Sequence, residues 1–372
     1  MTEILYFCGR PHTPEAMQSN GSSQRLILED GMAFEGRAFG HPESTQGEVV
    51  FNTGMVGYTE ALTDPSYKGQ ILVLTTPLVG NYGVPRDESP DLLQSAFESQ
   101  RIHIRGLVVS DYSFDFSHWE GAQTLDAWLR KHRVPALSGI DTRRLTKHIR
   151  QRGSMLGRIE VSIREDLLID PNGEDLVSTV TVPQPIFYRG GRPKVILIDC
   201  GCKHGIVRHL LMRGATVLRV PYDYDFLEED FHAVLISNGP GDPKQCRTTV
   251  AHLQTAMKRD VPIFGICLGN QLLALAAGAD TFKLKFGHRG HNQPCLDLKT
   301  GRCYITSQNH GYAVKNETLP GGWEPWFVNA NDGTNEGIRH VSKPFMGVQF
   351  HPEACPGPLD TTHLFDEFLQ LV

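Results

Sequence analysis

The sequence predicts an α/β protein of two domains. The C-terminal domain is expected to have a central, mostly parallel sheet, and the N-terminal α/β domain to be smaller. Three observations indicate this. The chain has 372 residues, more than one hydrophobic core usually holds. A stretch rich in proline and glycine, with little hydrophobic periodicity, runs from 170 to 193 and is typical of a linker. After it, short apolar runs alternate with glycine-rich turns and helical patterns, as in a parallel sheet with helical crossovers.

Four segments follow from these patterns. Residues 1–24 contain a stretch rich in serine, glycine and asparagine, and we expect them to form a disordered or loose tail. Their composition is neither that of a secretory signal nor that of a transit peptide. We expect the N-terminal domain at 25–165, the linker at 166–193 and the C-terminal domain at 194–372.

In the N-terminal domain, short runs rich in valine, isoleucine and leucine predict strands at 25–30, 48–54, 70–76 and 104–110. Helical patterns cover 124–132 and 141–153, with Asp141 as N-cap and Gly153 as stop. These patterns indicate an α/β or α+β domain and leave its topology open.

In the C-terminal domain, the run KVILIDC is continuously apolar, as expected of a strand buried on both faces. Further strands are expected in TVLRVP, AVLISN, PIFGIC and MGVQF, and helices in GIVRHLLMRG, in the segment up to about Lys258 and in LGNQLLALAAG. Ligands of such sheets bind beyond the carboxyl ends of the strands.

Composition excludes several classes of function. A net charge of −6 and a pI near 6.2 give no basic footprint for nucleic acid. No apolar run approaches the roughly 20 residues of a membrane span.

Eight cysteines without a disulfide-like rhythm indicate reduced thiols and a cytoplasmic location. Cys200 with Cys202, or His288 with His291, resembles half a zinc site, but neither has a second pair at zinc spacing, so no metal is expected.

The segment Gly265-Ile266-Cys267-Leu268-Gly269 joins a predicted buried strand to a predicted helix. This is the cysteine counterpart of the G-x-S-x-G nucleophile elbow, in which glycines allow a tight strand-to-helix turn. A thiol at a helix N-terminus is shifted toward the reactive thiolate. Free cysteines are also common as small buried hydrophobes, so the motif alone leaves both interpretations open.

A second strand end carries His351-Pro352-Glu353. A histidine there can reach a neighbouring elbow as general base and acid, and a carboxylate two residues on can orient its ring. A single such histidine is more often structural, but together with Cys267 it predicts a Cys-His-Glu triad.

Two further polar segments accompany these motifs. Ser237–Pro243, at a strand end, has glycines on both sides of a proline and can present backbone N–H groups to a developing oxyanion. It lacks the Lys-Ser/Thr signature of a phosphate loop. Gln308–Tyr312 is expected to be a short polar loop that forms hydrogen bonds to the polar ends of a small amino acid. Each also fits an ordinary turn.

Together these motifs resemble the class I, triad-type glutamine amidotransferases, and within them the small, glutaminase subunit of carbamoyl-phosphate synthase. The resemblance extends over nearly the whole chain after about Arg25. It includes the N-terminal segments LILEDG, GEVVFNTGMVGY and LTDPSYKGQILVLTTPLVGNYG, and the later segments SGIDTRRLT, HRGHNQP, TSQNHGYAV, NDGTNEGI and VQFHPEA.

The resemblance implies that Cys267 attacks the side-chain amide of L-glutamine to form a thioester. His351 would protonate the departing ammonia and then activate water, and Glu353 would orient His351. Gly239 and Leu268 match the backbone positions of the oxyanion hole. The positions that hold the amino-acid end of the substrate are matched by Ser66, Gly241, Gln271, Asn309, Gly311 and Tyr312.

Because Ser66 lies in the N-terminal domain, the pocket is expected to straddle both domains. The ammonia would pass to a synthetase subunit or domain that makes carbamoyl phosphate from bicarbonate, ATP and Mg²⁺. This chain shows no ATP site, and no cofactor is expected on it. The pathway, pyrimidine or arginine, stays open with pyrimidine favoured, as does whether the partner is a separate polypeptide.

Asn270 departs from the family pattern, which usually has histidine there. The same asparagine recurs in ammonia-using relatives that have lost the cysteine, so a catalytically inactive regulatory domain is one alternative. A peptidase or γ-glutamyl hydrolase of similar fold is another, although it would not need the N-terminal segments. Release of glutamate from glutamine discriminates among the three.

Overall fold

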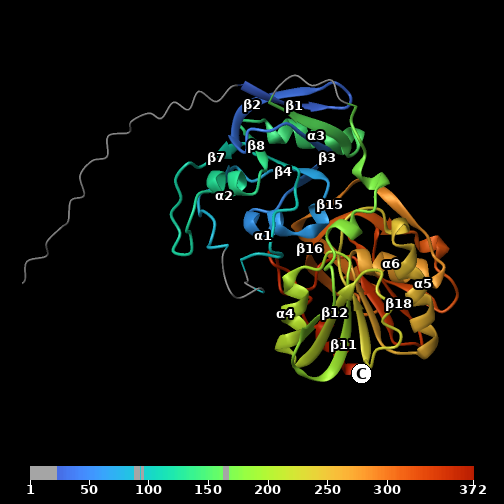
Figure 1. The fold of residues 1–372 in the computed structure, drawn as a ribbon. Helices are drawn as coiled ribbons and strands as arrows, with labels where there is room; N and C mark the ends of the chain where they lie inside the picture. Colours follow the sequence, from blue (N-terminus) through green and yellow to red (C-terminus); the bar gives the residue numbers. More distant parts are fainter. Residues whose placement is uncertain (1–22, 88–92, 94–95, 162–166) are drawn as a thin grey trace, which may run out of the picture.

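The structure is a computed structural model that describes residues 23–87, 93, 96–161 and 167–372. Residues 1–22, most of the expected tail, lie outside the described residues. Figure 1 shows two bodies side by side, one from each half of the chain. No described helix is long and apolar enough to cross a membrane.

The N-terminal half is a closed barrel with strand order β1-β2-β8-β6-β4-β3-β9. All four strands predicted here exist, with shorter or shifted bounds, and hairpins and crossovers that the pattern did not reveal close the sheet. The first strand begins at 23, just before the expected start of the domain. The barrel strands are β1 (Ser23–Leu28), β2 (Ala33–Gly40), β3 (Thr45–Asn52), β4 (Gln70–Leu74), β6 (Gly106–Val108), β8 (Pro135–Ser138) and β9 (Met155–Glu160).

Among the residues described in this half, three helices pack around the barrel: α1 (Tyr58–Thr63), α2 (Leu125–Lys131) and α3 (Thr142–Arg152). A two-stranded sheet of β5 (Leu78–Val79) and β7 (Asp111–Tyr112) lies nearby. The predicted end signals of α3 are confirmed. Asp141 accepts a hydrogen bond from the N–H of Arg144 (2.8 Å), and Gly153 follows the last turn with φ 111°, a backbone region that favours glycine.

The C-terminal half is built on a ten-stranded sheet, in the order β10-β12-β11-β13-β14-β19-β18-β17-β15-β16. The five strands from β12 to β19 are mutually parallel, as predicted, and antiparallel strands extend both edges. The strands are β10 (Ile186–Tyr188), β11 (Gly191–Asp199), β12 (Ala215–Pro221), β13 (Ala233–Ile236), β14 (Ile263–Ile266), β15 (Thr281–Asp297), β16 (Cys303–Val314), β17 (Trp323–Asn329), β18 (Asn335–His340) and β19 (Phe345–Val348).

Helices cover both faces of the parallel strands. Apolar residues of α4 (His204–Met212) and α7 (Leu364–Gln370) pack into one buried cluster, and those of α5 (Arg247–Ala256) and α6 (Leu268–Ala277) into the other. Because both faces are covered, the central strands are continuously apolar. This arrangement brings the carboxyl ends of β11, β13, β14 and β19 to one edge of the sheet.

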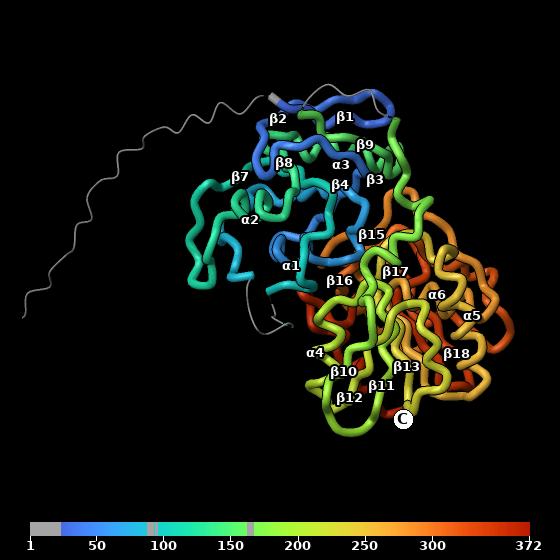
Figure 2. Tube along the Cα trace, in the orientation of Figure 1, coloured from blue at the N-terminus to red at the C-terminus, as the bar shows by residue number. Residues whose placement is uncertain are grey.

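The predicted linker is more structured than its composition indicates. It contains two short 3₁₀ turns, Pro171–Gly173 and Val177–Thr179, and the edge strand β10, which pairs with β12. Figure 2 shows its described part, from 167 onward, running past the junction of the two bodies to the sheet.

Strand β15 carries much of the contact between the two halves. The N–H of Thr53 donates to the carbonyl oxygen of Arg289 (3.2 Å), and the N–H of Ser154 donates to that of Lys285 (2.7 Å). An ion pair between Lys283 and Glu48, at 2.8 Å, adds a charged contact. The antiparallel part of the ten-stranded sheet therefore packs against the N-terminal half.

Candidate active site

A nucleophile elbow forms where β14 runs into α6. Cys267 lies between them with φ 55° and ψ −105°, a conformation rare for residues other than glycine. Close backbone contacts explain the flanking glycines. A Cβ on Gly265 would lie 2.4 Å from the carbonyl oxygen of Gly269, and one on Gly269 would lie 2.2 Å from that of Ile236. The predicted elbow is therefore present.

His351 and Glu353 lie just beyond the end of β19. The N–H of His351 donates to the carbonyl oxygen of Ser307 (2.9 Å), which fixes this segment against β16. The His351 Nδ1 atom is 2.6 Å from Glu353 Oε1, and both side chains are buried. The carboxylate thus orients the ring, as the spacing of the two residues predicts.

Electrostatics favour the ionised form of this pair. Burial lowers the pKa of His351, but the Glu353 carboxylate opposes it and, with help from Cys267, the net shift is upward. Burial raises the pKa of Glu353, but Lys203 and His351 reverse this and the net shift is downward. His351 can therefore donate and accept a proton beside Cys267.

A buried ionic network extends from Glu353 to the other half of the chain. Lys203 Nζ lies 3.1 Å from Glu353 Oε1 and 3.9 Å from Glu98 Oε2. Glu98 also pairs with Arg208 at 2.7 Å and accepts a hydrogen bond from the N–H of Gly205 (3.1 Å). Glu98 belongs to the N-terminal half, so this network links the barrel to the catalytic pair. The sequence motifs did not identify Lys203 or Glu98.

A narrow cavity opens at the Cys267 thiol. Its accessible volume of about 30 Å³ leaves room for little more than a water molecule. All eight residues predicted to bind substrate or stabilise the oxyanion line it together with Cys267: Ser66, Gly239, Gly241, Leu268, Gln271, Asn309, Gly311 and Tyr312. The structure thus brings the predicted residues to one place.

The cavity lies between the two halves of the chain. Asn238 Nδ2 donates to Ser66 Oγ (2.9 Å), and Asn309 Nδ2 donates to Asp64 Oδ2 (2.9 Å). Asp64 also accepts a hydrogen bond from the N–H of Ser66 (2.9 Å). These contacts place the only predicted N-terminal site residue against the C-terminal sheet. Asp64 was not predicted, and Asn238 was named only as part of the segment Ser237–Pro243, without a role for its side chain.

The loop Ser237–Pro243 follows β13, as expected. A Cβ on Gly239 would lie 2.1 Å from the carbonyl oxygen of Cys200, and Gly241 has a φ of 84°. Both positions therefore need glycine. The result is a loop whose backbone approaches both β11 and the cavity.

One local prediction is wrong. Gln308–Tyr312 is not a loop but lies inside the long strand β16, paired with β15. The polar side chains led to the loop prediction. A strand that lines a ligand site can carry hydrogen-bonding side chains at positions where a core strand carries apolar ones. The Cys267 Sγ atom lies 3.7 Å from the carbonyl oxygen of Asn309 in this strand.

Arg289 is a further cavity residue that the motifs did not single out, although it lies in the HRGHNQP segment. It is 5% exposed. Its guanidinium donates to the carbonyl oxygen of Phe286 (2.9 Å), and its Nε atom has no hydrogen-bond partner among the described residues. A buried cation at the cavity suits a substrate carboxylate.

Asn270 lies in the first turn of α6 but does not line the cavity. It is fully buried, and neither polar atom of its side chain has a hydrogen-bond partner among the described residues. A Cβ on Gly347 would lie 2.5 Å from its Oδ1 atom. The departure from the family pattern therefore affects packing between α6 and β19 rather than the cavity wall.

Two more cavities lie on the other side of the triad. A small one of about 20 Å³ is lined by His351, Asn309 and Pro356. It shares Asn52, Ala61 and His291 with a larger cavity of about 310 Å³.

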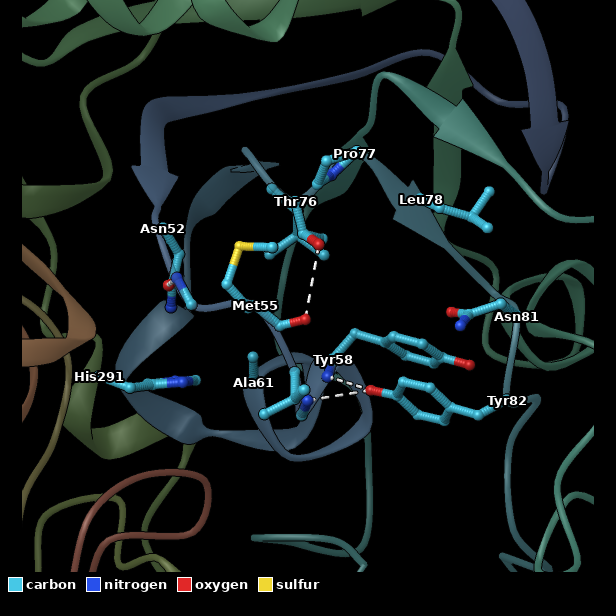
Figure 3. A pocket seen from close by; sticks show the side chains of 14 residues that line it. Asn52, Met55, Tyr58, Ala61, Thr76, Pro77, Leu78, Asn81, Tyr82 and His291 are labelled. Carbon is cyan, nitrogen blue, oxygen red and sulfur yellow. Dashed lines mark hydrogen bonds between the residues drawn. The ribbon is translucent and has the colours of Figure 1, made fainter.

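Figure 3 shows the larger cavity, with Asn52, His291 and Ala61 toward one end and Leu78 and Asn81 at the other. Tyr58 and Tyr82 stack along its side at a ring distance of 4.0 Å. Met55 and Leu78 on its wall are 64% and 46% exposed, so the larger cavity reaches the surface.

Comparison with known families divides the chain in the same way as its fold. A family model described as the carbamoyl-phosphate synthase small chain, CPSase domain, matches residues 26–159. The model for class-I glutamine amidotransferases matches residues 196–371.

Three relatives are similar over nearly the whole chain. The multifunctional protein pyr-3 of Neurospora crassa is 51% identical, over 93% of this chain and 21% of its own length. The arginine-specific carbamoyl phosphate synthase small chain of Saccharomyces cerevisiae is 48% identical, over 95% of this chain and 89% of its own. The mitochondrial carbamoyl-phosphate synthase [ammonia] of Homo sapiens is 47% identical, over 93% and 23%.

The chain spans about a fifth of the length of the multifunctional relatives it matches and most of the length of the yeast small chain. With a barrel and an amidotransferase sheet in the same order as the two family models, this chain belongs to the carbamoyl-phosphate synthase small chain family.

Proposed function

We propose that this chain hydrolyses L-glutamine to glutamate and ammonia and supplies the ammonia to a carbamoyl-phosphate synthetase subunit or domain. The observation that carries this proposal is that the Cys267 elbow and the buried His351–Glu353 pair follow two neighbouring parallel strands, β14 and β19. The N–H of Cys267 donates to the carbonyl oxygen of Val348 at the end of β19 (2.8 Å), and Cys267 is near enough to His351 to shift the histidine pKa. A cysteine peptidase would use similar groups, but family membership and the interdomain cavity favour glutamine.

In the proposed reaction, the Cys267 thiolate attacks the carboxamide carbon of glutamine. Backbone N–H groups of Gly239 and Leu268 stabilise the oxyanion. His351 gives its proton to the nitrogen as the C–N bond breaks, which releases ammonia and leaves a thioester. His351 then takes a proton from water, this water attacks the thioester carbon, and cleavage of the C–S bond releases glutamate and restores the Cys267 thiolate beside a protonated His351.

Substrate recognition is proposed to come from both halves of the chain. Ser66 on the barrel side, and Gln271, Asn309 and Tyr312 on the sheet side, surround the cavity at Cys267. We assign Arg289 to the substrate α-carboxylate, because it is the buried cation on this cavity. No cofactor on this chain takes part in the proposed hydrolysis; ATP, Mg²⁺ and bicarbonate belong to the synthetase.

The location and organisation of the protein are also proposals. All seven described cysteines are free thiols, which supports a reducing, cytoplasmic setting. The matched ranges 26–159 and 196–371 support domains at 25–165 and 194–372 with a connecting segment between them.

The decisive test is Cys267→Ser in the presence of the synthetase. Glutamine-dependent carbamoyl phosphate synthesis should vanish, because the serine hydroxyl is a far weaker nucleophile at neutral pH. Synthesis from added ammonium chloride should persist, because it does not use the thioester. The matched control is Cys303→Ser, an exposed thiol outside the cavity. Substantial glutamine-dependent turnover by Cys267→Ser would contradict the proposal.

We propose that ammonia leaves through the small cavity behind His351 and then through the larger one in Figure 3. The residues shared by the two cavities are small or uncharged: Asn52, Ala61 and His291. Burial, reinforced by Lys203, lowers the pKa of His291 to about 4. This imidazole is therefore neutral at pH 7 and does not repel a trace of ammonium.

Ala61→Phe should obstruct this route, because Ala61 is buried and lines both cavities. We expect glutamine hydrolysis to continue while carbamoyl phosphate formed per glutamate falls, with free ammonia appearing in the medium. Leu78→Phe, at the wide exposed end of the larger cavity, is the control and should keep the two products coupled. Unchanged coupling in Ala61→Phe would exclude this route.

A further inference from the structure

A compact cluster of potential metal ligands lies at one corner of the C-terminal sheet, on three different strands. His288 is on β15, His310 on β16 and Glu336 on β18. One ligand atom from each side chain lies within 4.8 Å of the others, and all three side chains are buried. Within the described residues, this is the single group of histidine, cysteine and acidic side chains with such geometry.

The spacing of these atoms fits a divalent metal ion. His288 Nδ1 is 3.1 Å and His310 Nε2 is 3.4 Å from Glu336 Oε1. Ligands bonded to tetrahedral zinc at 2.0–2.1 Å lie about 3.3 Å from one another. Only small movements would therefore place the three side chains in a zinc coordination sphere.

The other nitrogen of each imidazole already has an acceptor. His288 Nε2 is 2.9 Å from Asp332 Oδ2, and His310 Nδ1 is 2.9 Å from the carbonyl oxygen of Tyr312. Histidines that bind metal commonly donate their second N–H in this way, to a carboxylate or a backbone carbonyl. A carbonyl only accepts hydrogen bonds, so the proton of a neutral His310 is on Nδ1 and its Nε2 lone pair points toward Glu336.

Two buried atoms in the cluster have no hydrogen-bond partner among the described residues. They are His310 Nε2 and Glu336 Oε2, and both side chains are essentially inaccessible to solvent. A buried polar atom without a partner is costly, and a lone pair facing a carboxylate is repulsive. A cation between them would satisfy both atoms.

We propose that His288, His310 and Glu336 form a structural site for a borderline divalent ion, with Zn²⁺ the expected occupant. Two imidazoles and a carboxylate suit zinc, and Glu336 with Asp332 supplies two negative charges that balance the ion. The site would fix β15, β16 and β18 to one another. It would also hold His310 in place between Asn309 and Gly311 of the proposed substrate cavity.

The cluster is accessible for loading from one side. The Asp332 side chain is 46% exposed and contacts His288, whose own side chain is 9% exposed. Asp332 lies in the turn between β17 and β18, so an ion can enter by displacement of that turn.

The test uses the full chain stripped of metal with a chelator, then titrated with Zn²⁺ by calorimetry and with Co²⁺ by visible absorption. We expect one Zn²⁺ per chain, held by the three side chains and a water molecule, and a tetrahedral Co²⁺ spectrum without thiolate charge-transfer absorption, since no cysteine is a ligand. Glu336→Gln and His288→Asn should abolish this stoichiometric binding. His340→Asn, on β18 but outside the cluster, is the control and should bind normally.

Asp332→Asn keeps all three ligands and should fold, because its side chain is half exposed. We expect it to weaken zinc affinity about 10- to 100-fold, the usual effect of losing a carboxylate that orients a ligand histidine. Circular dichroism and a zinc-dependent rise in melting temperature distinguish loss of the site from loss of folding. If the stripped chain takes up no stoichiometric zinc, or Asp332→Asn and Glu336→Gln bind it as tightly as the unmodified chain, the proposal is wrong. The cluster would then be a proton-sharing network.

Discussion

At the residue scale, three buried ionisable side chains decide the proposed chemistry. Burial alone would leave His351 neutral, but Glu353 lies 2.6 Å from its ring and raises the histidine pKa above its ordinary value. Lys203, 3.1 Å from the same carboxylate oxygen, keeps Glu353 ionised. The positions of these charges therefore matter as much as the identity of the nucleophile.

His351→Asn should reduce glutamine hydrolysis about 10²- to 10⁴-fold, the usual contribution of a general acid–base residue. Glu353→Gln should cost less, because Glu353 transfers no proton to substrate. Glu353→Gln should also shift the pH profile. Once the carboxylate is removed, burial lowers the His351 pKa, so the imidazolium is lost at lower pH. The alkaline limb of the kcat/KM profile should therefore shift to lower pH.

These two variants are compared by steady-state glutamate release from pH 6 to pH 10, with folding followed by circular dichroism. Equal losses in both variants, or an alkaline limb that stays in place for Glu353→Gln, would contradict the assigned roles.

At the element scale, the N-terminus of α4 carries the link between the barrel and the triad. The backbone N–H groups of His204 and Gly205 donate to the main-chain oxygen and the carboxylate of Glu98 (2.9 and 3.1 Å). The same carboxylate pairs with Arg208, one turn further along the helix. Glu98 thus fixes the turn that presents Lys203 to Glu353.

Burial raises the pKa of Glu98 to about 7, against the opposing effect of Lys203 and Arg208. A carboxyl with a raised pKa is protonated below that pH, so its hold on Lys203 weakens as pH falls through about 7. Glu98→Gln should therefore lower kcat/KM about 10- to 150-fold, since a hydrogen bond to a charged group contributes about 1.5–3 kcal/mol. It should also abolish an inflection near pH 7 in the activity profile.

Glu120→Gln, an exposed carboxylate of the same half, serves as the control and should leave the profile unchanged. A Glu98→Gln variant that loses thermal stability but keeps its pH profile and kcat would show that Glu98 is only structural.

At the scale of the whole molecule, the substrate cavity is assembled from both halves of the chain and is narrow. Its accessible volume of about 30 Å³ is too small for glutamine, so we expect the residues that line it to move apart when glutamine binds. A low rate of glutamine hydrolysis in the absence of the synthetase would also avoid waste, because ammonia released without a synthetase is lost.

The isolated chain is therefore expected to be a slow glutaminase that retains glutamine binding. Addition of the synthetase should raise glutamate release by about ten- to a thousandfold, the range expected when a partner selects a conformation populated at 0.1–10%. Steady-state assays with and without the partner, together with capture of free ammonia, measure this. Full turnover by the isolated chain would contradict partner-dependent assembly of the site.

Local sequence was sufficient for the elbow and for the parallel core. Cys267 lies between glycines whose missing Cβ atoms are required by contacts of 2.4 and 2.2 Å, and such steric needs are visible as sequence motifs. The continuous apolar runs of β11, β13 and β14 likewise report burial on both faces. The eight predicted cavity residues came from family resemblance, and the fold gathers them at one site.

Tertiary structure alone decided the contacts between distant segments. The barrel closure, the link from Glu98 to Lys203 and the meeting of His288, His310 and Glu336 each depend on which strands become neighbours, and hydrophobic periodicity carries no pairing information of that kind. The segment Gln308–Tyr312 shows the same limit. Its polar residues predicted a loop, and only its pairing with β15 shows that it belongs to strand β16. Local sequence thus determined where each reactive group stands on its own element, and long-range packing determined which groups meet.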